Sequence, residues 1–282
     1  MRANNQPGSD FRNVTVLEGL KAWKVAEGGD EVQLYIAELH VHTVLSPCAE
    51  VEMIPPWIVR AALDKGINMI AITDHNASAN VSAVMKAAAG TGLVVLPGME
   101  VQTREEVHVV CLFDTLDQLA SWQALVTQQL PALENNVDLF GEQFVVDETG
   151  EFIRREAQLL LTSANLGLKQ VVEEVTRLGG MAIPAHVDRK AFSLIANLGF
   201  VPPDVAVAAL EITRHVTPEQ VRQRFPQVAG YPLVQSGDAH RLEELLGANQ
   251  FLLAAPTISE LRLALQNREG RWLRVGRTER PI

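Results

Sequence analysis

Histidine and acidic side chains recur in this sequence at spacings that would let several of them bind one metal ion. His40 and His42 are two residues apart, and Asp238 and His240 repeat this spacing near the other end of the chain. Side chains two apart on an extended strand point to the same face, so each pair can hold one ion, the second pair if its strand remains extended there. Imidazole nitrogens and carboxylate oxygens are the ligands of zinc, iron and manganese sites of the hydrolytic type, in which the ions lower the pKa of bound water.

More residues of both kinds lie near the ends of apolar runs. They are His75, Glu100, His108 and His186, with Asp74 and Glu211 close by. One histidine at a strand end is usually a hydrogen-bonded core or loop residue, so the prediction of a metal centre depends on the whole set. Six of the seven histidines belong to this set. The seventh, His215, directly precedes a predicted helix and is interpreted as a surface residue.

The elements that must position these residues alternate along the chain as short apolar runs and amphipathic helical segments. We predict strands within residues 32–39, 67–74, 93–100, 106–113, 181–186, 205–213, 231–240 and 250–256, and helices at 55–66, 81–92, 169–180 and from Pro218 onward. Such alternation is typical of an α/β fold with mostly parallel strands and helices outside them. The carboxyl ends of parallel strands meet at one face, where ligands bind. We therefore expect the histidines to converge there, although His108 lies early in its strand.

The composition is that of an ordinary globular protein. Hydrophobic residues make up 47% of the 282 residues and charged residues 21%, and the length suits one α/β barrel or two smaller domains. The formal net charge of -10 disfavours extended nucleic acid as a partner. Two cysteines, Cys48 and Cys111, do not make a disulfide scaffold, and neither a signal-peptide-like run nor a bilayer-spanning stretch is found. We expect a cytoplasmic protein with no membrane partner.

Taken in order, several motifs resemble the PHP family, the polymerase and histidinol phosphatase domains. They are HVHT (40–43), ITDHN (72–76), GMEV (98–101), the isolated His108, PAH (184–186) and SGDAH (236–240). The resemblance runs from about residue 36 to about residue 254 and is weakest at about 115–168, where an insertion is expected. It implies an α/β fold, specifically a distorted seven-stranded (β/α) barrel with its active site at the carboxyl ends of the strands. Residues 1–33 would then be an N-terminal extension and residues 34–282 the barrel domain.

The resemblance also implies two or three divalent metal ions, manganese, zinc or iron, that hydrolyse phosphoesters. Its eight implied ligands divide among three ions: His40, His42, Glu100 and Asp238 for the first, His75 and His240 for the second, and His108 and His186, with Glu100 bridging, for the third. Asp74 is expected to support catalysis by orienting a ligand, with a turn cap as the alternative. Arg189 follows His186 closely enough to grip a phosphate with its planar guanidinium group, whereas Lys190 and Arg214 are weaker candidates.

One position departs from the family pattern. The family usually has Ser-Asp-Gly after the His-x-His pair, and its aspartate serves the second ion, whereas this chain has Ser46-Pro47-Cys48. Proline offers no ligand. Glu50, Glu52 or a Cys48 thiolate could replace the carboxylate, but each has a simpler interpretation, the glutamates as solvated residues and the cysteine as a small buried one. We predict that two ions bind tightly and that the second ion is labile.

Together these features predict a metal-dependent phosphoesterase that acts on small phosphorylated metabolites or nucleotides. The alternatives are an oligonucleotide 5'-exonuclease, whose partner would be a short oligonucleotide, and a metal-binding regulatory module without turnover, which the missing aspartate allows. Within the insertion, DETG (147–150) has turn chemistry between two possible strands, and the segment is interpreted as a lid over the site or as an oligomer contact.

Overall fold

Short runs of aliphatic residues form the central sheet of the molecule. The computed structural model describes residues 22–23 and 31–276, and its main sheet has the strand order β12-β11-β2-β3-β4-β5-β8, with β1 beside β2. The bounds of these strands are β1 Ala22–Trp23, β2 Val32–Val41, β3 Met69–Ile72, β4 Val94–Gln102, β5 His108–Leu112, β8 Met181–Pro184, β11 Asn249–Leu253 and β12 Trp272–Val275. Every residue of β3 and β8 is buried, which explains why their sequences are continuous apolar runs.

The strand directions differ in part from the mostly parallel pairing that the sequence predicts. β2, β3 and β4 are parallel, as are β9 (Leu210–Thr213) and β10 (Leu233–Ser236), which form a separate two-stranded sheet. β5 is antiparallel to both β4 and β8, so the prediction is wrong there, as it is for β11 against β2. The cause at β5 is a short connection, because residues 103–107 alone join β4 to β5 and a parallel crossover requires about a dozen residues or more.

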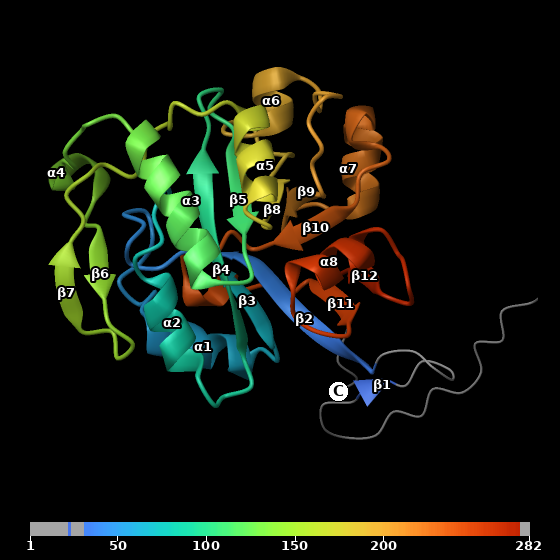
Figure 1. The fold of residues 1–282 in the computed structure, drawn as a ribbon, viewed down its shortest axis with the longest axis horizontal. Helices are drawn as coiled ribbons and strands as arrows, with labels where there is room; N and C mark the ends of the chain where they lie inside the picture. The colour runs from blue at the N-terminus through green and yellow to red at the C-terminus, as the bar shows by residue number, and fades with distance from the viewer. Residues whose placement is uncertain (1–21, 24–30, 277–282) are drawn as a thin grey trace, which may run out of the picture.

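Backbone hydrogen bonds connect the β9–β10 pair to β8 and to β2. Val187, which follows β8, donates its N–H to the Glu211 carbonyl of β9 at 2.8 Å. Ala239, which follows β10, accepts from His42 N and donates to His40 O, both at 3.0 Å. Figure 1 shows β9 and β10 beside β8 at one side of the curled sheet. The α/β class is therefore confirmed, and the curled sheet agrees with a barrel of PHP type.

Helices lie around the sheet, and several of them contact its strands (Figure 1). Their bounds are α1 Pro55–Asp64, α2 Val81–Ala88, α3 Leu116–Gln129, α4 Val137–Phe140, α5 Leu168–Arg177, α6 Leu194–Leu198, α7 Pro218–Arg224 and α8 Ile258–Leu265, with 3-10 turns at Pro226–Val228 and Leu242–Glu244. In α5 the buried residues recur three and four positions apart and face β8 and β5. Among the described residues, no helix has the length and apolar character needed to cross a bilayer.

The expected insertion contains α3, α4 and a hairpin of β6 (Phe144–Val146) and β7 (Phe152–Arg155). The two strands are antiparallel, and a hydrogen bond from Gly150 N to Asp147 O at 3.0 Å closes their turn, so the predicted strand, turn and strand are confirmed. Phe144 N donates to Val44 O at 2.9 Å, which fixes β6 to the loop after β2. The division into extension and barrel stays an interpretation, because most of residues 1–33 lie outside the described residues.

Candidate metal centre

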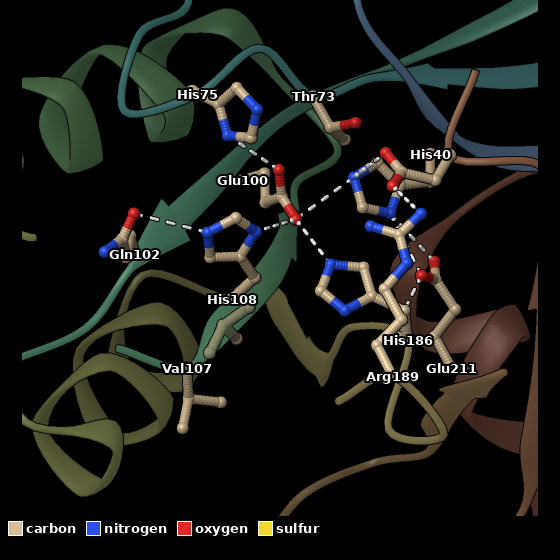
Figure 2. Close-up of polar contacts among 12 residues, drawn as sticks. His40, Thr73, His75, Glu100, Gln102, Val107, His108, His186, Arg189 and Glu211 are labelled. Atoms are coloured by element: carbon tan, nitrogen blue, oxygen red, sulfur yellow. Dashed lines mark hydrogen bonds and ion pairs between the residues drawn. The ribbon is translucent and has the colours of Figure 1, made fainter. Parts of the chain in front are cut away.

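Six histidines surround one buried carboxylate, that of Glu100. Neighbouring rings in this group, which we call the histidine cluster, have centroids 4.1–6.1 Å apart, and its members are His40, His42, His75, His108, His186 and His240. Figure 2 shows the Glu100 carboxylate between His75, His108, His186 and His40. His215 is exposed and lies outside the cluster. The structure thus brings together segments that are up to two hundred positions apart in the sequence.

The direction of β5 explains how His108 joins residues from the carboxyl ends of other strands. Since β5 is antiparallel to β4, its first residue lies beside the last residues of β4, with His108 opposite Gln102 and Val110 opposite Glu100. The Nε2 atom of His108 lies 3.3 Å from Gln102 Oε1. The one histidine that starts its strand therefore reaches the same edge as those that end theirs.

His42, His75, His186, Asp238 and His240 all follow their strands, and two of these positions have left-handed backbone. The φ angles of His186 and Asp238 are 32° and 49°, values that residues other than glycine seldom adopt. Asp238 is therefore not extended, and the interpretation that it shares one strand face with His240 is wrong. The turn instead directs Asp238 toward His42 and His40, while His240 stacks on His42 with ring centroids 4.1 Å apart.

Glu100 is the electrostatic centre of the cluster. Its Oε1 atom lies 2.9 Å from His108 Nδ1, 3.3 Å from His40 Nε2 and 3.4 Å from His186 Nε2, and its Oε2 atom lies 2.8 Å from His75 Nδ1. Burial alone raises the pKa of this carboxyl, but the adjacent His108, His40 and His75 hold it well below its usual value. A fully buried carboxylate that remains ionised among imidazoles is suited to bridging cations.

The two neighbouring histidines His40 and His42 are held in different protonation states. Burial lowers the pKa of His40, but the carboxylates of Glu211, Asp238 and Glu100 raise it well above its usual value. The pKa of His42 is well below its usual value, because burial and the neighbouring His240 and His75 disfavour its charged form. His42 is therefore neutral, the form in which histidine binds metal.

Asp238 connects the cluster to Arg189. Its Oδ1 atom lies 3.1 Å from His42 Nε2 and 3.3 Å from His40 Nε2, while its Oδ2 atom lies 2.6 Å from Arg189 Nη2. Burial raises the pKa of Asp238, but His40 and His42 keep it well below its usual value. The Arg189 side chain is 44% exposed, so it lies over the cluster and still faces solvent. Figure 2 shows it beside His40 and Glu211.

Two buried acids orient histidines without entering the cluster. Glu211 accepts from Nδ1 of His40 at 3.0 and 3.1 Å and from the His186 backbone N–H at 3.1 Å. Such a carboxylate fixes the ring and leaves its other nitrogen for a metal ion. Glu211 therefore supports the cluster by holding the His40 ring and the His186 backbone.

Asp74 acts through Ser46. Its carboxylate accepts from Thr43 N at 2.7 Å, Thr43 Oγ1 at 2.8 Å and Ser46 Oγ at 2.7 Å, and Ser46 Oγ in turn lies 2.9 Å from His42 Nδ1. Ser46 donates to Asp74, so it accepts from His42 and directs Nε2 of that ring toward Asp238. Asp74 thus contacts His42 through Ser46 and lies one residue removed from the cluster.

Several buried polar atoms of the cluster have no hydrogen bond, although burial makes an unsatisfied polar atom costly. They are Nε2 of His40, Oε2 of Glu100 and both ring nitrogens of His186. A bound cation would satisfy them. Three sets of donor atoms lie within 4.8 Å of one another: His40, His42 and Asp238; His42, His75 and His240; and His75, Glu100 and His108. The residues present therefore fit divalent metal ions.

These sets agree in part with the division among three ions that the resemblance implies. The first set repeats three of the four expected ligands, whereas His42 joins His75 and His240 in the second. His186 belongs to none of the three sets found among the described residues, although its Nε2 atom lies 3.4 Å from Glu100 Oε1. The assignment of each ligand to one ion stays a prediction.

The sequence did not single out Ser46, Gln102 or Glu38, each of which supports the cluster. Glu38 accepts from the backbone N–H groups of Gly237 at 3.0 Å and Leu246 at 2.7 Å, so it secures the segment that contains Asp238. Its position two residues before His40 on the same strand face was a signal that could have identified it. Ser46 lies four positions after the His42 that it contacts and Gln102 six positions before His108, in a turn and across a strand pair where no strand period applies.

Some candidates from the sequence lie away from the cluster. Arg214 forms an ion pair with Glu244 at 2.7 Å, and Lys190 is exposed. His215 lines an open cavity of about 630 Å³ with Arg214 and the start of α7. Of the three cations Arg189, Lys190 and Arg214, Arg189 is the one that contacts the site, through Asp238.

A buried group of histidines and carboxylates at the strand ends of a mixed α/β fold is typical of metal-dependent hydrolases. Within that class, the chain belongs to the PHP family, because the PHP domain model matches residues 38–198. A search of curated proteins finds no match.

Several solved structures are similar to this chain. The lesion-specific endonuclease Q from Pyrococcus furiosus matches with a TM-score of 0.64 and 19% identity over 86% of this chain and 58% of its own. An amidohydrolase from Chromobacterium violaceum matches with 0.50 and 19% over 75% and 89%, and a putative metal-dependent phosphoesterase from Bifidobacterium adolescentis with 0.49 and 18% over 78% and 89%. This chain thus spans little more than half of endonuclease Q, and at these identities the likeness concerns the fold.

Proposed function

We propose that this PHP protein is a metal-dependent phosphoesterase that hydrolyses small phosphorylated metabolites or nucleotides with two or three divalent ions. The observation that carries the proposal is Glu100, an ionised and fully buried carboxylate in the histidine cluster, where Oε2 of Glu100, Nε2 of His40 and both ring nitrogens of His186 lack hydrogen bonds. Membership of the PHP family supports the same class of reaction.

The proposed site has three parts: the metal ions, the residues that orient the histidines, and Arg189. When bound, the ions lower the pKa of water and neutralise phosphoryl oxygens. Glu211 and the pair of Asp74 and Ser46 hold the imidazoles of His40 and His42 with Nε2 facing inward. Arg189, ion-paired with Asp238 at the cluster and partly exposed, is placed to bind two oxygens of the phosphoryl group.

Two features support a small substrate, including a nucleotide. The net charge of -10 repels a long polyanion. Phe192 is 44% exposed and stacks on His108 with ring centroids 4.9 Å apart, so it offers a flat apolar surface next to the cluster on which a nucleobase can stack. The proposal includes a cytoplasmic location, because the two cysteines are free, as is usual in a reducing compartment.

The test is hydrolysis of a chromogenic phosphomonoester and a chromogenic phosphodiester by metal-stripped protein reloaded in turn with manganese, zinc and iron. We expect metal to restore turnover in the wild type and in His215→Ala, a matched histidine outside the cluster, but not in His42→Ala. Bound metal without turnover under every loading would contradict the proposal and favour a regulatory module.

An oligonucleotide substrate is the second candidate, because the fold of endonuclease Q matches this chain with a TM-score of 0.64. Salt dependence separates the two. Hydrolysis of a short oligonucleotide would weaken steeply with added salt, since several phosphates release counterions on binding, whereas hydrolysis of a monophosphate would change little. A steep slope with higher kcat/KM for the oligonucleotide would favour the second candidate.

A further inference from the structure

The loop after β2 brings Cys48 to the edge of the histidine cluster. Its Sγ atom lies 3.1 Å from Nε2 of His240, and the His75 ring is within hydrogen-bonding reach of the same thiol. Cys48 is exposed, so its interpretation as a small buried residue is wrong. The cysteine therefore lies beside His75 and His240. In the family, an aspartate at the position of Pro47 serves the ion that these two histidines bind.

The loop is held in this position by backbone contacts on both sides of Cys48. Glu50 N donates to His240 O at 2.9 Å, and Ala49 N donates to Ser46 O at 2.9 Å. Ser46 Oγ also accepts from His75 N at 3.2 Å. The loop that contains Cys48 is thus hydrogen-bonded to the backbone segments that contain His240 and His75.

The two glutamates that could have replaced the missing carboxylate do not reach the cluster. The Glu50 carboxylate forms an ion pair with Arg241 at 2.8 Å in solvent. Glu52, like Cys48, belongs to none of the donor sets found among the described residues, and unlike Cys48 its side chain has no hydrogen bond or ion pair with a cluster histidine. Of the three replacements that the sequence allows, the structure brings one, Cys48, against a cluster histidine.

Independent atoms indicate a cation at this place. Ring nitrogens of His42, His75 and His240 lie within 4.8 Å of one another. Oε2 of Glu100 is fully buried and has no hydrogen bond, yet it lies 2.8 Å from His75 Nδ1 and 3.5 Å from His42 Nε2. Several potential ligand atoms thus lie close together around a buried carboxylate oxygen that has no hydrogen bond, and a cation between them would satisfy that oxygen.

We propose that the Cys48 thiolate is a ligand of the ion that His75 and His240 hold, in place of the missing aspartate. The inference rests on the proposed function, because it requires a metal centre. On binding, a sulfur–metal bond forms and the thiol proton is released to solvent. A thiolate is a softer donor than a carboxylate, so this position prefers zinc or iron to manganese, and the expected lability of the second ion is replaced by tight binding of a soft metal.

Cobalt(II) tests the ligand directly, since it occupies zinc sites and gives a near-ultraviolet sulfur-to-metal charge-transfer band when a thiolate binds it. Metal-stripped protein is reloaded with cobalt, dialysed, and measured for bound cobalt and absorbance. We expect the band in the wild type and in Cys111→Ala, which removes the buried cysteine outside the cluster. Cys48→Ser should lose the band and one equivalent of cobalt, whereas Cys48→Asp, which keeps an anionic donor, should lose the band and retain the metal.

The outcomes separate this inference from the proposed function. Cobalt bound by the wild type without the band, or a band that survives in Cys48→Ser, would overturn the thiolate ligand while the phosphoesterase remains. Protein that binds no cobalt would overturn both. Alkylation gives a second readout, because iodoacetamide should modify Cys48 in stripped protein and be blocked by zinc, and equal rates with and without zinc would count against the bond.

Discussion

Nδ1 of His40 lies 3.0 and 3.1 Å from the two carboxylate oxygens of Glu211, so Nε2 of the same ring faces Glu100 and Asp238. This contact joins β9 to β2 across the interior of the fold. Because an ionised carboxylate accepts the Nδ1 proton, it fixes the ring orientation and increases the electron density on Nε2. The ligand atom of His40 is therefore set by a residue that does not itself bind metal.

Replacing Glu211 with Gln should weaken metal binding by about 10–100-fold, the usual effect of losing a carboxylate partner of a metal-binding histidine. The amide retains one acceptor but loses the charge that holds His40. Competition with a chromogenic chelator measures the affinity. Glu148→Gln, on the exposed hairpin turn, is the control and should leave it unchanged. Equal affinities of Glu211→Gln and wild type would remove Glu211 from the metal centre.

Replacing Arg189 with Ala should raise KM for a phosphoester by about 10–100-fold, because a charge-assisted hydrogen bond contributes about 1.5–3 kcal/mol. Metal content should change far less, since Arg189 contacts Asp238 from the solvent side. Steady-state kinetics with elemental analysis of the same samples measures both. Arg241→Ala, which breaks the exposed pair with Glu50, is the matched control. Unchanged kinetics would exclude Arg189 from substrate binding.

Replacing Phe192 with Ala should raise KM for a nucleotide by about 5–100-fold while leaving a phosphomonoester without a base unaffected. The reason is that stacking on an aromatic ring contributes about 1–3 kcal/mol per base. The ratio of the two KM values is the measurement. Phe200→Ala removes another half-exposed phenylalanine and serves as control. An equal change for both substrates would show that Phe192 does not contact the base.

Much of the sheet could be predicted because burial and sequence coincide. β3 and β8 are buried along their whole length and are therefore uninterrupted apolar runs. The antiparallel direction of β5 was missed because β5 is an apolar run like those of β3 and β8. Only the short connection at residues 103–107 shows that the chain must reverse direction between β4 and β5.

The cluster was predictable for a similar reason. The carboxyl ends of parallel strands lie at one edge of a sheet, so the histidines that follow β2, β3, β8 and β10 come together there regardless of the loop conformations. Contacts that depend on side-chain direction were not predictable. Asp238 reaches His42 through a left-handed turn, and Ser46 reaches Asp74 across the sheet edge. Neither follows a period in the sequence, because each depends on the packed backbone.

The relay from Asp74 through Ser46 should be measurable at His42. Ser46→Ala removes the acceptor of His42 Nδ1 and should reduce metal affinity by about 10-fold. Asp74→Asn should have a smaller effect, because the amide oxygen still accepts from Ser46 and Thr43. The double variant should lose little more than Ser46→Ala alone, since both act through one contact. Additive losses would contradict the relay, and Ser78→Ala, a serine bonded to Gln123, is the control.

Glu38 should make folding stability depend on pH. Burial raises the pKa of this carboxyl from 4.5 to about 7, and backbone N–H groups of Leu246 and Gly237 offset this only in part. Between these two values the unfolded chain releases the proton while the folded protein keeps it. The contribution of Glu38 to the free energy of unfolding is therefore fully present below about pH 4.5 and is lost as the pH rises through about 7.

Glu38→Gln is neutral at every pH and lacks this dependence. The difference in unfolding free energy, wild type minus variant, should fall by about 3 kcal/mol between about pH 4.5 and about pH 8, from a shift of roughly two to three units at 1.36 kcal/mol each. Urea unfolding of both metal-loaded proteins across this range measures it, and protonation of the histidines affects both alike. Glu134→Gln, at an exposed position, is the control, and its unfolding free energy should change with pH in the same way as that of the wild type. If that of Glu38→Gln also changed in the same way, Glu38 would be ionised in the folded protein, and its carboxylate would be stabilised by the backbone N–H groups of the segment before Asp238.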